Sequence, residues 1–304
     1  MLMQRLDHPP VTAQRPGVQT LTAAEHPALT VEVGSDLDPG ITRRQKPNED
    51  TLSIIRGVIP ALAWKPFLLL LVADGMGGLT NGQEASRLAA QSVASFVSAA
   101  LRARRVTSES FQPLLKAGVE EANRVLHERN QEQNSEMGTT MTAALIVDTC
   151  AYVAHVGDSR LYLYREAVGL SQITQDHSLV AALAAAGIIR PEDIYTHPRR
   201  NLIYRCLGEK SKVEVDTATV PLAAGDMLLL CSDGLWEMVR DRQIAALLTA
   251  PTDGPSQTAH ALIQAALAGG GEDNVSAIVA RMSRACGQED ALGRLQQIGA
   301  LPGG

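Results

Sequence analysis

Two stretches decide the fold: LLLLVADGMGG at residues 68–78 and MLLLCSDGL at residues 227–235. Each is an apolar run that ends in a small residue, an aspartate and a glycine. The run at 67–73 is typical of a strand that is buried on both faces. If two such strands face each other across one core, Asp74 and Asp233 lie opposite each other at its end.

The composition excludes several classes of protein. The chain has 304 residues, of which 45% are hydrophobic, as expected for a protein with a buried core. A net charge of −6 and an aromatic content of 3% argue against a nucleic-acid-binding surface. The longest apolar stretch is far shorter than the roughly 20 residues of a membrane span. The N-terminus lacks the apolar segment of a signal peptide. We therefore expect a soluble, cytoplasmic protein.

Hydrophobic periodicity predicts blocks of strands and pairs of helices rather than strict alternation of the two. Period-two patterns predict strands at 29–36, 51–58, 139–148 and 150–166, and further strands are predicted at 67–73, 226–232 and 273–282. In 150–166 the residues GDSR form the turn between two consecutive antiparallel strands. Helical patterns occupy 84–105, 109–131, 178–187 and 241–248, and Ser256 caps a further helix that ends at glycines 269–271. This segregation favours a layered α+β fold. We expect one domain at 29–283, a flexible N-terminal tail at 1–28 and a C-terminal tail at 284–304.

Acidic residues recur where predicted strands end. A buried group of carboxylates repels itself unless cations neutralise it. Oxygen donors of this kind suit Mg²⁺ or Mn²⁺, and two such ions can clamp a phosphate for in-line attack. The pattern therefore suggests a two-metal site, although a single Asp-Gly after a strand is usually only a turn. The residues in question are Glu49, Asp50, Asp74, Asp158, Asp233 and Asp273.

Eight motifs in order add a resemblance to a known family. They are PNED, VADGMGG, GTTMTAALI, VGDSRLYLYR, TQDHSLV, HPRRNLIYRCLG, GDMLLLCSDGLWEMV and GGGEDNVSAIVAR. Together, over residues 32–283, they resemble the bacterial branch of the metal-dependent serine/threonine protein phosphatases of the type 2C family. The resemblance implies a four-layer α/β/β/α sandwich with two central antiparallel sheets flanked by helices.

The resemblance also implies a set of site residues. Asp74 would bridge two Mn²⁺ or Mg²⁺ ions, and the Gly75 carbonyl would bind the first of them. Asp233 and Asp273 would bind the second ion. Asp158 matches the position of a third, weaker site in bacterial members. Glu49 and Asp50 would act through bound water to position the nucleophile, and an arginine upstream of NED would bind the substrate phosphate.

The chain departs from the family pattern in the arginine loop. The family spaces its motif as Gly-x-x-Arg-x-x-Asn, whereas Gly40 to Asn48 is two residues longer, so that Gln45 falls at the strict position. Arg43 keeps the spacing from the glycine, and Arg44 lies nearer the asparagine. Either side chain is long enough to reach a bound phosphate, and the guanidinium fork of arginine suits phosphate. Of the two, we favour Arg43 as the phosphate ligand. The alternative, that both arginines only solvate a longer loop, stays open.

A second departure is Met76, which stands where many eukaryotic members have a histidine that protonates the leaving alkoxide. Methionine cannot donate a proton, but it is common here in bacterial relatives, and water can protonate the leaving group instead.

The predicted activity is hydrolysis of phosphoserine and phosphothreonine in proteins, without a covalent enzyme intermediate. The expected partners are phosphorylated proteins, including a serine/threonine kinase or its substrates, with no nucleic acid or membrane, and the expected state is a monomer. One alternative is a pseudophosphatase that binds phosphorylated partners without turnover; the presence of Asp74, Asp233 and Asp273 argues against it. A structural calcium-binding domain is a third possibility, but it gives no reason for the NED and GDSR motifs.

Overall fold

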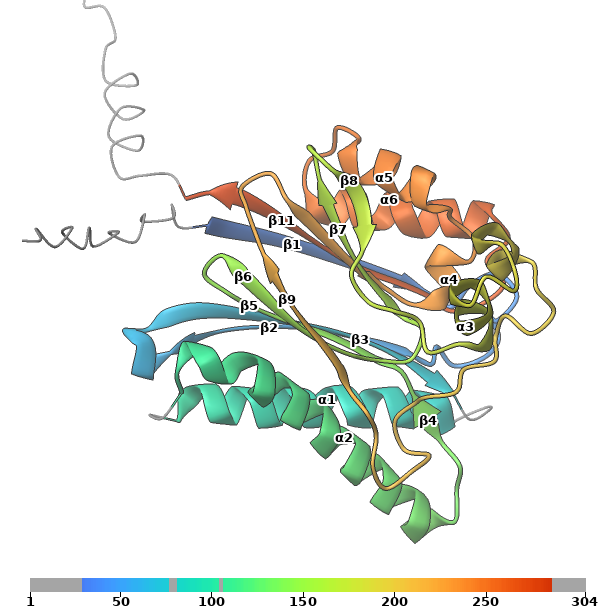
Figure 1. Cartoon of the computed structure of the whole chain (residues 1–304), viewed down its shortest axis with the longest axis horizontal. Coiled ribbons are helices and arrows are strands. Elements are labelled where there is room, and N and C mark those ends of the chain that lie inside the picture. The colour runs from blue at the N-terminus through green and yellow to red at the C-terminus, as the bar shows by residue number, and fades with distance from the viewer. Residues whose placement is uncertain (1–28, 77–80, 104–105, 286–304) are drawn as a thin grey trace, which may run out of the picture.

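Two antiparallel sheets lie face to face, and helices cover the outer face of each (Figure 1). This arrangement confirms the predicted four-layer α+β sandwich. The computed structural model describes residues 29–76, 81–103 and 106–285. The predicted tail at 1–28 and all but residues 284–285 of the tail at 284–304 lie outside the described residues. Within the described ranges, no helix combines the length and the apolar composition that crossing a bilayer requires.

One sheet is covered by the first two helices. Its strands run in the order β2 (Asp50–Ile59), β3 (Lys65–Met76), β5 (Met141–Val147), β6 (Cys150–Val156) and β9 (Asp216–Pro221), and the two-residue β4 (Gly138–Thr139) pairs with the end of β3. The long helices α1 (Asn81–Arg102) and α2 (Phe111–Gln133) pack on its outer face. A 3₁₀ turn at Pro60–Leu62 joins β2 to β3, and another at Ser108–Ser110 precedes α2.

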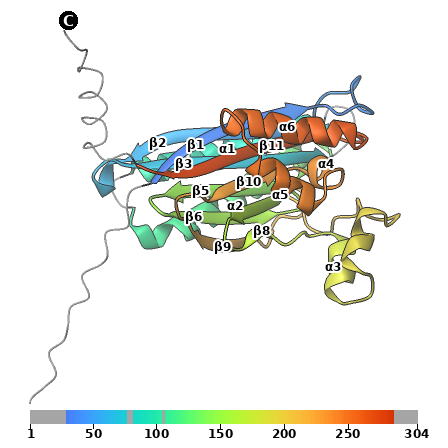
Figure 2. The same cartoon turned by 90° about the horizontal axis from the view of Figure 1, so that it is seen from above.

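The other sheet has the order β1 (Leu29–Asp38), β11 (Val275–Arg284), β10 (Met227–Cys231), β7 (Arg160–Arg165) and β8 (Gly169–Gln172). Its outer face is covered by α4 (Asp233–Trp236), α5 (Asp241–Thr249) and α6 (Pro255–Ala268). The segment between β8 and β9 carries α3 (Leu179–Ala185) and a 3₁₀ turn at Pro191–Tyr195. This segment projects beyond one end of the sandwich (Figure 2).

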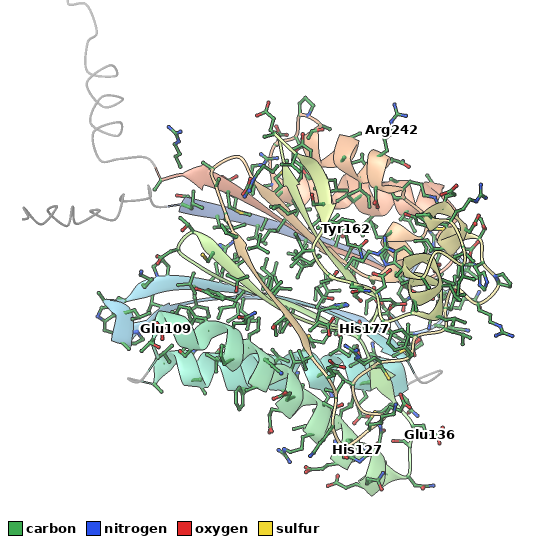
Figure 3. The ribbon with its side chains drawn as sticks, in the orientation of Figure 1. Glu109, His127, Glu136, Tyr162, His177 and Arg242 are labelled. Atoms are coloured by element: carbon green, nitrogen blue, oxygen red, sulfur yellow. The ribbon has the colours of Figure 1, made fainter. Side chains whose placement is uncertain are left out.

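Strand periodicity explains why the carboxylates meet between the sheets. In β3, Leu69 and Leu71 pack toward α1 and α2, whereas Leu68, Leu70 and Val72 fill the core between the sheets. Side chains fill this space along the sandwich (Figure 3). Because side chains alternate along a strand, Asp74 continues the inter-sheet series. The end of β3 thus turns the apolar inter-sheet core into a polar one.

The strand β10 repeats this arrangement from the opposite sheet. Its Leu228 and Leu230 belong to the same inter-sheet core, so Ser232 follows on that face. The Ser232 hydroxyl donates to Asp50 Oδ2 at 2.7 Å, and Asp50 is the cross-strand partner of Asp74. Cross-strand partners share a face of a sheet. The acidic ends of both sheets therefore face one another.

The GDSR segment differs from the prediction. The strands on either side of it, β6 and β7, are not neighbours but belong to opposite sheets, so GDSR crosses from one sheet to the other. A period of two shows which face of the sheet each side chain takes, but it does not show which other strand lies beside this one. Gly157 makes the crossing with φ +111°, a conformation in which other residues are strained. The crossing leaves Asp158 buried at the end of the inter-sheet core.

Helix bounds differ from the predictions by a few residues. The helix predicted at 84–105 begins at Asn81 and ends at Arg102, and residues 104–105 lie outside the described residues. The last helix begins at Pro255, with Gly254 rather than Ser256 at the N-cap, because proline fits the first helical position. Strands β8 and β9 have no counterpart in the prediction.

Candidate active site

Buried carboxylates from both sheets meet at one end of the inter-sheet core. Glu49 directly precedes β2, Asp50 is its first residue, Asp74 lies near the end of β3, and Asp158 lies in the crossing segment. Asp233 is the first residue of α4, and Asp273 precedes β11. Glu49, Asp50 and Asp158 are each at most 6% exposed, whereas the Asp273 side chain is 38% exposed. The structure thus brings together all the acidic residues that the sequence predicted.

Asp74 lies at the electrostatic centre of this group. Burial raises its pKa well above the usual value, and the charges of Asp50 and Asp233 raise it further. Burial likewise raises the pKa of Asp233 well above its usual value, with Asp158 as the next cause. Mutual repulsion of this strength is what a polyvalent cation relieves.

Two neighbouring carboxyls are shifted less. Burial raises the pKa of Asp50 to about 6, although hydrogen bonds from Ser232 and Ser276 oppose the shift. Burial raises the pKa of Asp158 to about 7, with the charge of Asp176 as the second cause. Near neutral pH these two groups therefore titrate, so protons compete with any cation that binds there.

Several oxygens of this group have no protein partner. Glu49 Oε1, Asp50 Oδ1 and Asp233 Oδ1 are buried without a hydrogen bond. Buried acceptors are normally satisfied, so these three indicate a missing positive group. Their oxygen chemistry fits Mg²⁺ or Mn²⁺. In the part of the chain that the structure describes, no three His, Cys, Asp or Glu side chains already converge as a metal cage.

The Arg43 guanidinium lies among these carboxylates. The arginine that keeps the family's spacing from Gly40 is therefore the one that reaches the acidic centre. It forms ion pairs with Glu49 and with Asp273, which is 230 residues away in the sequence. Arg44 and Gln45 are exposed. The longer loop therefore brings Arg43, and not its neighbours, to the acidic centre.

Close backbone packing explains the glycine that follows Asp74. A Cβ atom on Gly75 would lie 2.0 Å from the carbonyl oxygen of Gly82 at the start of α1. The Gly75 amide also donates to the Glu49 carbonyl at 3.1 Å. This position therefore needs glycine to hold the Asp74 backbone against both β2 and α1.

Sequence reasoning missed the amide that fixes Glu49. Asn274 Oδ1 accepts from the Glu49 amide at 2.8 Å, and Asn274 Nδ2 donates to the Pro39 carbonyl at 2.9 Å. Asn274 belongs to the EDNV motif, but only its neighbour Asp273 was given a role. The available signal was its position beside Asp273 at the start of a predicted strand, and the structure shows that Asn274 is buried.

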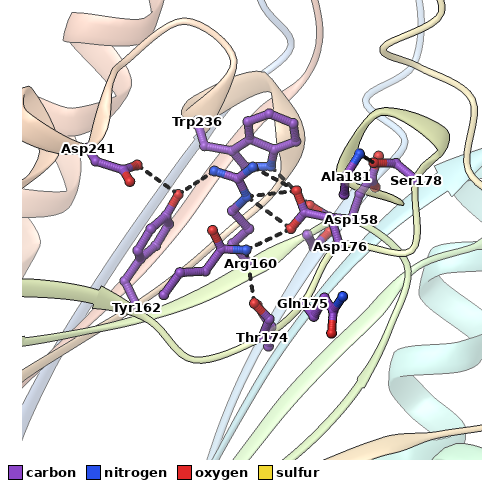
Figure 4. A network of polar contacts seen from close by, with 12 residues as sticks. Asp158, Arg160, Tyr162, Thr174, Gln175, Asp176, Ser178, Ala181, Trp236 and Asp241 are labelled. Atoms are coloured by element: carbon purple, nitrogen blue, oxygen red, sulfur yellow. Dashed lines mark hydrogen bonds and ion pairs between the residues drawn. The ribbon is translucent and has the colours of Figure 1, made fainter. Parts of the chain in front are cut away.

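Sequence reasoning also missed a buried network behind Asp158 (Figure 4). Trp236 Nε1 donates to the Asp158 carbonyl at 3.0 Å, and the Arg160 guanidinium lies 3.6 Å from the centre of the Trp236 ring. Arg160 Nη2 also pairs with Asp176 Oδ2 at 2.6 Å, and both side chains are at most 4% exposed. Trp236 thus fixes the backbone of Asp158.

Comparison with known proteins identifies the family of the chain that carries this site. The family model described as protein phosphatase 2C matches residues 41–269, which include all the acidic residues above except Asp273. The chain belongs to the protein phosphatase 2C family. The resemblance seen in its motifs is thereby confirmed.

Individual relatives of the phosphatase agree with this assignment. Serine/threonine phosphatase stp of Listeria monocytogenes is 40% identical over 215 residues, covering 69% of this chain and 83% of the relative. Protein phosphatase PhpP of Streptococcus pneumoniae is 35% identical over 225 residues, covering 73% and 87%. The chain is a bacterial-type protein serine/threonine phosphatase.

Solved structures agree with the fold of the phosphatase. The S. agalactiae serine/threonine phosphatase superposes with a TM-score of 0.74 at 30% identity, covering 83% of this chain and 99% of that one. The catalytic domain of PstP, solved in complex with two manganese ions, gives a TM-score of 0.70 at 34% identity, covering 84% and 99%.

The raised carboxyl pKa values predict how the stability of the phosphatase depends on pH in chelator. In the folded state Asp158 keeps its proton up to about pH 7, whereas in the unfolded chain it is already ionised. The folded state then binds more protons, so the free energy of unfolding falls as pH rises. We expect the melting temperature in chelator to drop by about 2–4 °C between about pH 6.5 and pH 8.

Differential scanning calorimetry in chelator and in excess Mn²⁺ measures this effect. Mn²⁺ should abolish the decline, because a cation bound only by the folded state keeps these carboxylates ionised. The window begins near pH 6.5 because burial lowers the pKa values of His155 and His177, which oppose the trend in more acidic solution. A melting temperature in chelator that rises over this window would contradict the prediction.

Proposed function

We propose that this phosphatase hydrolyses phosphoserine and phosphothreonine in proteins with two Mn²⁺ or Mg²⁺ ions at the end of its inter-sheet core. The observation that carries the proposal is the set of buried carboxylate oxygens without a partner on Glu49, Asp50 and Asp233. The PstP catalytic domain, a relative of the same fold, was solved with two manganese ions. The partners we propose are phosphorylated proteins, including a serine/threonine kinase or its substrates.

The proposed ligands follow the arrangement of the acidic centre. Asp74 would serve both ions, the Gly75 carbonyl would serve the first, and Asp233 and Asp273 would serve the second. Asp158 would serve a third, weaker ion. When bound, such ions polarise the phosphate and make water a stronger nucleophile. Burial, together with repulsion among these aspartates, raises the pKa values of Asp74 and Asp233 and supports the assignment. A bound cation relieves the repulsion and displaces the protons from the carboxyl groups.

The remaining residues act on water and phosphate. The Ser232 hydroxyl holds Asp50, and Asn274 holds the backbone of Glu49. Each of the two carboxylates has a free oxygen that accepts a hydrogen bond from the attacking water. The Arg43 fork binds the phosphate oxygens in two-point fashion. Met76 has no proton to give, so the leaving oxygen takes its proton from water.

Phosphate release from a phosphothreonine peptide tests the proposal. We expect release by the wild type in millimolar Mn²⁺ and none in chelator. Arg43→Gln should lower kcat/KM by about 10²-fold, because a charged two-point contact to phosphate is lost. Arg44→Gln is the matched control and should behave as the wild type, since that side chain is exposed.

Three results would contradict it. Release that persists in chelator would exclude the metal-dependent reaction. Equal losses in the two arginine variants would remove Arg43 from the phosphate site. Binding of the phosphopeptide without release at any metal concentration would favour the pseudophosphatase.

A further inference from the structure

A cavity of about 700 Å³ begins beside the acidic centre. Met76, which lines it, follows Gly75 directly on β3 and is the cross-strand partner of Gly138 on β4, a second lining residue. The remaining walls come from the end of α2 and from the segment around Gly208. A peptide whose phosphorylated residue lies at Asp74 therefore has this cavity next to it.

The cavity walls are held in place by one buried side chain. Asn130, 6% exposed, donates from Nδ2 to the carbonyls of Met137 and Gly208 at 2.7 and 3.1 Å. Its Oδ1 accepts from the Ser135 hydroxyl and from the Met137 amide at 3.0 and 3.1 Å. Asn130 thus ties α2, the turn after it and the Gly208 segment into one preformed wall.

The charges at this cavity favour a cation. Among the described residues that line it, Glu136 and Glu209 are acidic and there is no lysine or arginine. Glu136 makes no hydrogen bond or ion pair with any described residue. Glu209 makes two long contacts: its Oε1 lies 3.8 Å from Lys210 Nζ, and its Oε2 accepts from the Cys206 thiol at 3.8 Å. Both glutamates are exposed at the rim, and Glu136 lies close to the end of α2, like His127 (Figure 3).

The C-terminus of α2 adds to this preference. The helix runs 23 residues and ends at Asn134, which has left-handed backbone and donates its amide to the Asn130 carbonyl. The carbonyl end of a helix carries a partial negative charge that favours cations. The apolar part of the lining, Met76, Met137 and Cys206, suits an aliphatic stem below a charged head.

We infer that this cavity is a subsite for a lysine or arginine side chain of the phosphorylated substrate. The inference rests on the proposed function and adds a sequence preference to it. Met76, which lines the cavity, is two residues from Asp74 on the extended strand β3. Because an extended chain advances about 3.3–3.6 Å per residue, a substrate peptide covers this separation in about two or three positions, and the basic residue lies that far from the phosphorylated one. Glu136 and Glu209 are its ion-pair partners.

The test compares phosphothreonine peptides that carry arginine or its neutral isostere citrulline at one of these positions, on either side of the phosphothreonine. The readout is the ratio of kcat/KM for the two peptides within each enzyme variant, so any loss of folded protein cancels. We expect the wild type to prefer arginine by about fivefold to tenfold at the best position, as two exposed ion pairs allow.

Glu136→Gln/Glu209→Gln should bring this ratio close to one. Glu132→Gln is the matched control: it removes the same charge from the same end of α2, but Glu132 lies outside the cavity and pairs with Arg129. It should keep the wild-type ratio. A ratio near one in the wild type at every position, or an unchanged ratio in the double variant, overturns the subsite. Wild-type enzyme that releases phosphate from neither peptide in Mn²⁺ overturns the proposed function itself.

Discussion

Asp74→Asn should reduce phosphopeptide turnover in Mn²⁺ by about 10³-fold, which corresponds to about 4 kcal/mol of transition-state stabilisation. Burial, together with the charges of Asp50 and Asp233, raises the pKa of Asp74 well above its usual value. Its replacement takes away the proposed shared ligand. The amide keeps the shape of the side chain. Steady-state kinetics at several Mn²⁺ concentrations measures the loss.

The same substitution should stabilise the protein in chelator. A neutral amide relieves the repulsion at the acidic centre, so the melting temperature in chelator should rise by about 2–4 °C while Mn²⁺ stabilises the variant less than the wild type. Lower activity with higher stability in chelator separates a lost ligand from a lost fold. Wild-type turnover at saturating Mn²⁺ would remove Asp74 from the metal centre.

Arg160→Met should destabilise the protein by about 3–5 kcal/mol, because it leaves the carboxylate of Asp176 buried without its partner. Both side chains of the Arg160–Asp176 pair are at most 4% exposed, and Arg160 also donates to the Tyr162 hydroxyl at 2.7 Å. Urea unfolding in Mn²⁺ measures the difference. The loss should be accompanied by weaker Mn²⁺ binding, because Arg160 supports the Trp236 ring that holds the Asp158 carbonyl.

A double variant distinguishes two causes of the lost stability, the buried unpaired charge and the lost packing. Arg160→Met/Asp176→Leu removes both charges, and we expect it to be more stable than Arg160→Met alone. Arg124→Met provides the exposed comparison: its ion pairs with Glu121 and Glu128 lie on the surface of α2, so no measurable change is expected. A double variant as unstable as the single one would show that packing, and not the stranded carboxylate, is the cause.

The sequence predicted the parts of the site that follow from strand periodicity. The apolar runs at 67–73 and 226–232 predicted two buried strands that end at Asp74 and Asp233, and the resemblance supplied the arrangement of the two sheets. Periodicity could not show that GDSR crosses between sheets, because a strand pattern says nothing of its neighbour. It also missed the short strands β8 and β9.

The polar contacts within the site were less predictable. The pairing of Arg43 with Asp273, the bond from Trp236 to Asp158 and the amide of Asn274 all join residues that are far apart in the sequence. Such contacts depend on the finished fold and not on local pattern. For the arginine loop, where two additional residues blur the motif, only the structure distinguishes Arg43 from Arg44.

The division of the acidic centre between two sheets has a consequence for partly folded molecules. Asp50 and Asp74 come from one sheet, whereas Asp233 and Asp273 adjoin strands of the other. A molecule with one sheet formed and the other undocked holds only half of the acidic residues. If the acidic centre is the catalytic site, as proposed, chains caught midway through synthesis or degradation lack a complete site and release no phosphate.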